Sequence, residues 1–491
     1  MRFLLGDADL SGAGAMELGL ENALPDAILK RDLSGAGAME LGLESALPDV
    51  ILKRDLSGAG AMELGSLDAQ QDLSGAVEGL MDVLPDAIVQ HLLCLLSNAE
   101  DVAACSCVCK RWRELMGSVR RLVFPRSLSD KGLHSSALVN RMVRSTAELE
   151  ELVVYCTLTS AGLMECVAHA AKSLKLLEFR VEEGSDKACV GKLEVLSRSS
   201  CDLETLRLWG GILLHSPVGL RSFTGLRTLE VVGARIRDGA LRGILAACPA
   251  LRELALLGCD GIRSVCVELK ELEKCRLDFC GSGDNCFVSV AAPKLRVFEV
   301  QGASYIRIAE DSSLQHLSIA KQTGMLANVE VGKLPALASL SIRGLQWDWG
   351  AIQKMLQSAT QVETLYMKIE FCGDDEAFEP FRDIDFGDFL TSHPKLKKLD
   401  AHGALFASLV LKEEIATPPL ALWLEEANIT IRSPLNAERK LQVLKSMISW
   451  SPLLRKVRLR ITQMKCTDIE ADEFFLNLIR LKRVYDFITI D

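Results

Sequence analysis

The 491-residue chain has few aromatic residues, an excess of negative charge and no long apolar run. Aromatic side chains make up 5% of the sequence and hydrophobic ones 49%, so the core must be aliphatic, chiefly leucine. The formal net charge of −10 argues against nucleic-acid binding or binding to anionic membranes, because both need clustered positive charge. No stretch approaches the roughly 20 apolar residues of a membrane-spanning helix. We therefore expect protein partners, with no nucleic acid and no membrane.

The motifs of common catalytic and metal sites are also missing. The sequence has no G-x-S-x-G, no GxxxxGK[ST] and no HExxH, so we expect no catalytic residues, no cofactor and no enzyme activity. Cys105, Cys107 and Cys109 form a C-x-C-x-C pattern. On a helix the first and third share a face while the second points away, which does not suit a tetrahedral zinc site. We therefore predict no bound metal.

The sequence contains 16 cysteines, but their positions do not suggest disulfides. Cys166, Cys248 and Cys275 lie inside apolar periodic segments, where a free thiol packs as a small hydrophobic group. The first ten residues hold too short an apolar run for a secretory signal. A reducing compartment is expected, so we predict a cytoplasmic or nuclear location.

Tandem repeats open the chain. Asp9–Arg31 and Asp32–Arg54 are 23-residue blocks that differ at two positions, and a third start at Asp55 breaks off. Residues 1–80 are rich in glycine, and each helical glycine costs about 1 kcal/mol relative to alanine. We predict a flexible, disordered low-complexity tail over 1–80. An alternative is that its two Leu-Pro-Asp copies compete weakly for the partner of the third copy, Leu84-Pro85-Asp86.

A short helical module follows from Val83. Pro85 fits a first helical position, and Ile88, Leu92, Leu95 and Leu96 then form an apolar stripe on one helix face. Ser97 and Glu100 have capping-box spacing and predict the start of a second helix. This second short helix is expected around Asp101–Cys105, and a third around Ser106–Met116. About 40 residues are too few for a self-sufficient core, so this module should bury part of its surface on a partner.

Residues 83–123 resemble the F-box, and we place this domain at 81–125. The resemblance is carried by Leu84-Pro85-Asp86, Ile88, Leu92, Leu96, Asp101-Val102 and Val108-Cys109-Lys110-Arg111-Trp112. One departure is the missing proline after the first helix. The resemblance implies docking onto the Skp-type adaptor of a cullin–RING ubiquitin ligase. The positions implied to contact the adaptor are Leu84, Pro85, Ile88, Leu92, Val108 and Trp112.

Beyond Pro125 the chain repeats the phrase L-x-x-L-x-L with conservative replacements. The phrase begins at Leu149, Leu174, Leu203, Leu226, Leu251, Leu272, Leu295, Leu314, Leu337, Val362, Leu396 and Leu454. Spacings of about 19 to 29 residues up to Val362 are the leucine-rich-repeat period, with one short strand and a helical or irregular return per turn. The longer final gaps suggest degenerate strands near Leu409–Leu411 and Ile429–Ile431.

Several returns carry helix signals. Asp238 and Asp348 are candidate N-caps before apolar helical stripes, and Cys248-Pro249 should end the first of these helices. No repeat buries its apolar face alone, so neighbours must stack. We predict an α/β solenoid over 126–491, a curved leucine-rich-repeat array with a parallel sheet on its concave face.

A three-helix F-box followed by such an array resembles the plant-type F-box/leucine-rich-repeat proteins. This implies a non-catalytic substrate-recognition subunit of an SCF-type ubiquitin ligase: the F-box binds the adaptor, and through it cullin and RING protein, while the repeats bind a protein substrate. Alternatives are a leucine-rich-repeat scaffold outside any ligase and a small-molecule, hormone-like sensor of the same architecture.

The residues between the strand leucines should line the concave face, because strand side chains alternate. The candidate substrate-binding residues are Arg207, Trp209, Arg276, Arg343, Tyr366 and Lys368. A sensor of the family needs a strongly basic floor for a polyphosphate cofactor, and here Glu230 and Asp278 interrupt the basic residues. Trp209 and Trp347 lie just past strand ends, where they either bind a partner or cover a neighbouring turn of the solenoid.

Overall fold

The computed structural model describes residues 84–127, 135–156, 158, 160–170, 173–181, 202–210, 213–214, 223–279, 286–309, 313–321, 328–345, 347–370, 382–411, 421–431, 436–461 and 468–491. The chain divides into two units, Met1–Glu78 and Gly79–Asp491, and all described residues belong to the second. The predicted disordered tail and its Leu-Pro-Asp copies therefore lie outside the described residues.

Three short helices and a 3₁₀ turn begin the described chain. They are α2 (Asp86–Leu95), α3 (Ala99–Ser106), α4 (Lys110–Leu115) and η1 (Met116–Ser118). The capping box predicted at Ser97 is wrong by one residue, because Asn98 caps α3 by accepting a hydrogen bond from the Glu100 N–H at 3.0 Å. The backbone carbonyl of Ser97 instead accepts a hydrogen bond from the Val123 N–H at 2.7 Å, and Val123 belongs to the first strand, β1 (Arg121–Phe124).

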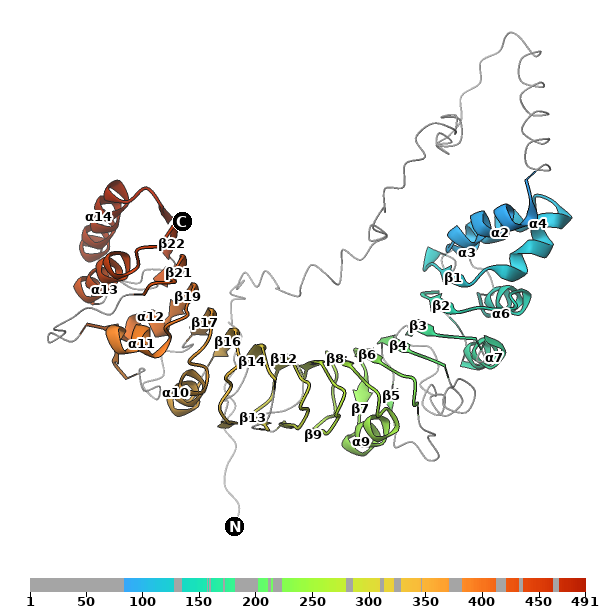
Figure 1. Ribbon diagram of the computed structural model, residues 1–491, viewed down its shortest axis with the longest axis horizontal. Coiled ribbons are helices and arrows are strands. Elements are labelled where there is room, and N and C mark those ends of the chain that lie inside the picture. The colour runs from blue at the N-terminus through green and yellow to red at the C-terminus, as the bar shows by residue number, and fades with distance from the viewer. Residues whose placement is uncertain are drawn as a thin grey trace, which may run out of the picture. The chain divides into compact units, whose positions relative to one another are not determined.

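Fifteen parallel strands form one sheet along the inner side of a curved array (Figure 1). In sheet order they are β1 (Arg121–Phe124), β2 (Glu151–Val154), β3 (Leu176–Val181), β4 (Thr205–Gly210), β6 (Thr228–Val232), β8 (Glu253–Leu257), β10 (Lys274–Asp278), β12 (Val297–Gln301), β14 (His316–Lys321), β16 (Ser339–Leu345), β17 (Thr364–Glu370), β19 (Lys398–Gly403), β21 (Glu426–Ile431), β22 (Lys456–Ile461) and β23 (Ile488–Ile490). This confirms the predicted solenoid with a parallel concave sheet.

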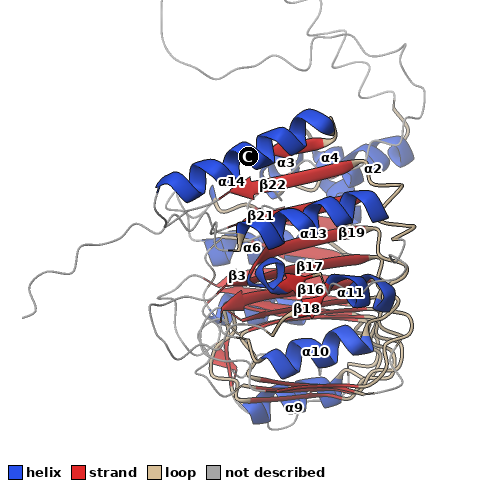
Figure 2. Cartoon of the chain, turned by 90° about the vertical axis from the view of Figure 1, so that its left-hand side faces the viewer, coloured by secondary structure: helices blue, strands red, loops and turns tan. Residues whose placement is uncertain are grey.

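Helices cover the outer side of the sheet on either side of the middle of the array (Figures 1 and 2). They are α6 (Ser135–Ser145), α7 (Ser160–Ala170), α9 (Asp238–Ala247), α10 (Trp349–Ser358), α11 (Phe386–Ser392), α12 (Ala404–Ser408), α13 (Ala437–Trp450) and α14 (Asp468–Val484). Asp348 caps α10 as predicted, accepting from the Ala351 N–H at 2.9 Å. Asp238 does not cap α9, because its carboxylate accepts from the Arg263 N–H of the next repeat.

In the middle of the array the returns are strands instead of helices. A second parallel sheet contains β9 (Ser264–Val267), β11 (Phe287–Val290), β13 (Tyr305–Ile308) and β15 (Asn328–Val331). A strand rises about 3.3 Å per residue and a helix 1.5 Å, so a strand crosses the same width with fewer residues. This accounts for the shorter repeat spacing in the middle of the array.

Two further strand pairs lie outside these sheets, β5 (Leu213–Leu214) with β7 (Arg235–Ile236) and β18 (Ile384–Asp385) with β20 (Leu409–Val410). The degenerate strand predicted at Ile429–Ile431 is confirmed as part of β21. The one at Leu409–Leu411 is β20, so it does not belong to the concave sheet. The strands β1 and β23 extend that sheet beyond the predicted phrases at both ends.

One hydrophobic core runs from the F-box helices through the whole array. The strand leucines fill it as the alternation predicts: Leu251, Leu254 and Leu256 are each at most 1% exposed. Val89 and Leu93 of α2 belong to the same core. The F-box module therefore completes its core against the first repeats, and its remaining apolar surface is available to a partner.

Candidate functional site

The first helix of the F-box, α2, has two apolar faces. Val89 and Leu93 point into the core and are 0% and 1% exposed. Ile88 and Leu92 lie one helical turn apart on the other face and are 46% and 43% exposed. Leu95 extends this face at 68% exposure. Leu95 lies seven residues after Ile88 and belongs to the apolar stripe predicted from the sequence. The predicted adaptor contacts did not include it.

Arg111 of α4 fixes the start of α2. Its guanidinium donates to the Asp86 carboxylate, with Nη2 and Nε each 2.7 Å from Oδ1, and to the carbonyl oxygen of Leu84. Pro85 is the N-cap residue, and its extended backbone turns the chain into the helix. The Leu-Pro-Asp turn is therefore held against α4 by charge-assisted hydrogen bonds, which are stronger than neutral ones.

The other predicted adaptor contacts come from three places: Val108 lies between α3 and α4, Trp112 lies in α4, and Leu84 precedes α2. Val108 is 65% exposed, whereas Trp112 and Leu84 are half-buried and pack against the core. The Cys109 thiol caps α4 by accepting from the Trp112 N–H at 3.4 Å. The structure thus gives Ile88, Leu92 and Val108 exposed side chains and gives Trp112 a share in supporting the helices. Their contact with an adaptor stays a prediction.

On the concave face, Arg207 lies between two carboxylates. The register places it opposite Glu178 of β3 and Glu230 of β6, and its nitrogens approach them to 3.1 and 3.3 Å. The Tyr155 hydroxyl also donates to Glu178 at 2.6 Å. Glu178 is 6% exposed, so this is a nearly buried ion-pair network that neutralises one predicted substrate-binding arginine.

Trp209 is half-buried beside two apolar neighbours on the same concave row. The register sets it opposite Val232 of β6, which in turn faces Leu257 of β8. Together they form a half-buried apolar strip across three strands. The sequence analysis missed Val232 and Leu257. Their signal is the position directly after the last buried strand leucine or valine, which points to the concave side because strand side chains alternate.

Arg343, Tyr366 and Lys368 come together on the neighbouring strands β16 and β17, where Arg343 faces Lys368 in register. Arg276 lies apart on β10 and is paired with Glu299 at 3.4 Å. Trp347 is 5% exposed and donates from its indole nitrogen to the Arg343 carbonyl at 3.2 Å. Trp347 therefore covers the solenoid core, and of the two tryptophans Trp209 alone contributes to the concave surface.

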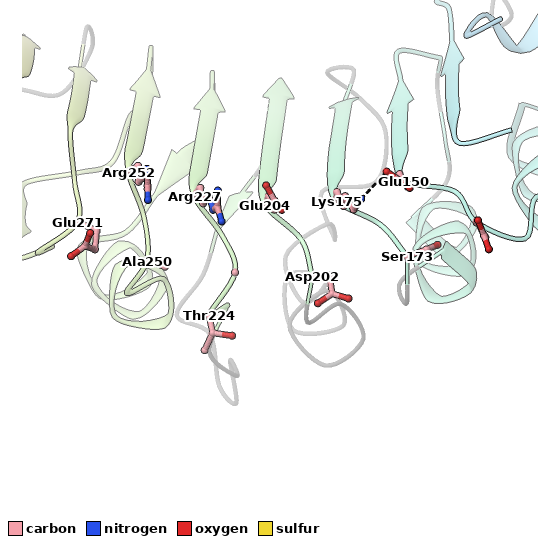
Figure 3. A pocket seen from close by; sticks show the side chains of 12 residues that line it. Glu150, Ser173, Lys175, Asp202, Glu204, Thr224, Arg227, Ala250, Arg252 and Glu271 are labelled. Atoms are coloured by element: carbon pink, nitrogen blue, oxygen red, sulfur yellow. Dashed lines mark hydrogen bonds and ion pairs between the residues drawn. The ribbon is translucent and has the colours of Figure 1, made fainter. Parts of the chain in front are cut away.

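A hollow of about 710 Å³ lies along the rim where strands β2 to β10 begin. Figure 3 shows Lys175, Glu204, Arg227 and Arg252 at the starts of successive strands, with the Lys175–Glu150 ion pair drawn as a dashed line. The hydrogen bond from Lys175, at 2.8 Å, lowers the pKa of the Glu150 carboxyl. Acidic and basic groups alternate along this open rim, an arrangement that suits contact with a protein surface better than capture of a small molecule.

The described cysteines are free thiols. Burial raises the pKa of Cys156 to about 11 and that of Cys166 to about 12, so these thiols are protonated and unreactive at neutral pH. Among the described residues, no group of three or more histidine, cysteine or acidic side chains is arranged to hold a metal ion. Within the same residues, no helix combines the length and apolar character needed to cross a membrane.

The fold and its exposed helix face define a class: a short F-box module joined to a leucine-rich-repeat solenoid. Comparison with known proteins gives the same result. A family model described as F-box-like matches residues 81–123, and the At1g61320/AtMIF1 LRR domain matches 149–370. Among Arabidopsis thaliana proteins, F-box protein At1g10780 is 42% identical over 418 residues, covering 83% of this chain and 99% of its own length.

Two more distant relatives are named F-box/LRR-repeat proteins. F-box/LRR-repeat protein 25 of Arabidopsis thaliana is 27% identical over 37% of this chain and 68% of its own length. F-box/LRR-repeat protein At1g67190 of the same plant is 22% identical over 61% of this chain and 74% of its own length. The chain belongs to the plant F-box/leucine-rich-repeat family.

Proposed function

We propose that this chain is a non-catalytic substrate receptor of an SCF-type ubiquitin ligase, acting in the cytoplasm or nucleus. The observation that carries the proposal is the apolar face of α2, where Ile88, Leu92 and Leu95 remain exposed although Val89 and Leu93 of the same helix are fully buried. An exposed apolar patch beside a completed core is typical of a protein-binding surface. Docking of a Skp-type adaptor on this face would connect the chain to cullin and RING protein.

The concave sheet would then select the protein substrate. A receptor of this kind acts by proximity, because holding a substrate lysine near a loaded conjugating enzyme replaces a bimolecular encounter with a high effective concentration. The hormone-like sensor is less well supported, since carboxylates already neutralise Arg207 and Arg276, two of the basic residues that a polyphosphate would need.

The test is co-expression of the full chain with a Skp-type adaptor. We expect the two proteins to co-elute as a one-to-one complex in size-exclusion chromatography with light scattering. Separate elution of the adaptor from a chain whose helices are intact by circular dichroism would contradict the ligase assignment. The leucine-rich-repeat scaffold outside a ligase would then be the better description.

A further inference from the structure

Two predicted substrate-binding cations, Arg343 and Lys368, have no carboxylate partner in the described part of the chain. They lie opposite each other on β16 and β17, on the same concave row. Arg207 and Arg276, by contrast, each pair with a glutamate on a neighbouring strand. Two adjacent cations of this kind repel each other unless an anion lies between them.

The hydrogen bonding of Arg343 is incomplete. Its Nη2 donates to the Ser318 hydroxyl at 3.4 Å, a long contact, and its buried Nε has no acceptor. A guanidinium has five N–H donors in a fixed fork that matches a carboxylate or a phosphate. A buried donor without an acceptor is costly, so an arriving anion would both complete the bonding of Arg343 and neutralise the pair.

The same concave row continues across three more strands. The register leads from Lys368 to His402 of β19, Thr430 of β21 and Arg460 of β22. Arg460 is exposed and makes no ion pair with a described residue. Strands lie about 4.8 Å apart, so the row from Arg343 to Arg460 is about 19 Å long, the span of about six extended residues.

Two carboxylates beside this row in the described chain contact other residues: the Asp491 Oδ2 lies 3.4 Å from the Arg458 Nε, and Asp400 has two polar neighbours. The His402 Nε2 lies 2.6 Å from its Oδ1, and the Asn428 amide donates to its Oδ2 at 3.3 Å. The side chains of Asp400 and Asp491 therefore pair with residues other than Arg343, Lys368 and Arg460. The chain as a whole carries a net charge of −10, which repels an acidic partner elsewhere and favours its docking at this row.

We propose that Arg343, Lys368 and Arg460 bind an acidic stretch of the protein substrate that runs across strands β16 to β22. This inference rests on the proposed receptor function and adds a substrate class to it. The apolar strip of Trp209, Val232 and Leu257 would contact a different part of the same substrate. Glutamate and aspartate side chains or phosphorylated serines supply the same anionic chemistry.

The test uses the full chain and fluorescent peptides of about eight residues, long enough to span the row. One peptide carries glutamate at alternate positions, a second carries glutamine and a third carries phosphoserine at the same positions. We expect the glutamate peptide to bind in a salt-sensitive manner and the glutamine peptide not to bind. Tighter binding of the phosphoserine peptide would identify phosphorylated protein as the source of the anion.

The variant Arg343→Gln/Lys368→Gln should weaken binding of the glutamate peptide by roughly tenfold, since charge-assisted bonds are lost at both positions. The matched control Lys274→Gln/Arg307→Gln removes the same charge from two exposed residues that are already paired, at 2.8 and 3.8 Å. The control should keep the affinity of the unmodified chain within about twofold.

Three results would overturn the proposal: no binding of either anionic peptide, equal loss in the two double variants, or tighter binding of a single-stranded DNA oligonucleotide than of the peptides. Adaptor co-elution is measured on the same variants. Because the substituted residues lie far from α2 in the chain, adaptor binding should not change. Failure of the anion site and failure of the ligase assignment therefore give different results.

Discussion

Truncation of the exposed face of α2 should weaken adaptor binding without unfolding the chain. In Ile88→Ala/Leu92→Ala, the two side chains are 46% and 43% exposed, so a little less than half of each remains to be buried by a partner. Full burial of such a side chain is worth about 2–3 kcal/mol, so each contributes about 1 kcal/mol at the interface. The sum of about 2 kcal/mol corresponds to a roughly thirtyfold weaker affinity.

Isothermal titration calorimetry with purified Skp-type adaptor measures this loss. The matched control is Leu422→Ala/Leu476→Ala, because these leucines are 51% and 53% exposed and come from the other end of the array. The control should bind the adaptor as the unmodified chain does, and both double variants should keep its unfolding midpoint. Equal affinity of the Ile88/Leu92 variant and the control would refute the assignment of the adaptor face.

Three further predictions concern stability and reactivity. Gly344→Ala should lower the free energy of urea unfolding by at least about 2 kcal/mol, because φ at Gly344 is +129° and a Cβ there would lie 1.8 Å from a carbonyl oxygen of β14. In the control Gly239→Ala, the new Cβ meets no atom within 4 Å, so this variant should stabilise α9. Burial lowers the pKa of His393 in the folded chain, so as the pH falls the unfolded chain binds a proton at this histidine before the folded chain does. The free energy of unfolding should therefore fall as the pH drops below about 6.5, and it should fall less in His393→Gln. Burial raises the pKa of Cys248 to about 12, so mass spectrometry after iodoacetamide treatment at pH 8 should find Cys107, which is exposed, alkylated and Cys248 unmodified.

The solenoid could be predicted because its signal repeats. Each L-x-x-L-x-L phrase places two leucines of a strand on one face and a third in the preceding turn, and Leu251, Leu254 and Leu256 show this pattern in the structure. The second sheet escaped prediction because its strands have only four residues. In Ser264–Val267, for example, just Val265 and Val267 are buried, and two valines are too short a pattern to distinguish strand from irregular return.

The local caps show a different limit. Asp238 and Asp348 have the same sequence signal before an apolar stripe, yet Asp348 caps its helix and Asp238 does not. The Asp238 carboxylate binds the backbone of Arg263, a residue of the next repeat. A contact across 25 positions of sequence has no local signature, so tertiary packing decides which aspartate becomes the cap.

The same reasoning applies to the concave face. Alternation of strand side chains correctly placed Arg207 and Arg343 on this face, but it could not show which of them carries an unpaired charge. That depends on the residues opposite on the neighbouring strands. These are Glu178 and Glu230 for Arg207, but Ala320 and Lys368 for Arg343. The strand register, which only the fold supplies, therefore divides one predicted basic surface into a neutralised part and a cationic part.

The attachment of the F-box bears on how such a receptor would work. The turn η1 ends at Ser118 and β1 begins at Arg121, so only two residues separate the module from the sheet. β1 pairs with β2, and the Val123 N–H bonds back to Ser97 between α2 and α3. A flexible linker would spread a bound substrate over many positions, whereas this continuous core fixes the adaptor face relative to the concave sheet. Since effective concentration depends on that geometry, insertion of a flexible glycine–serine segment after Ser118 should lower substrate ubiquitination while leaving adaptor affinity unchanged.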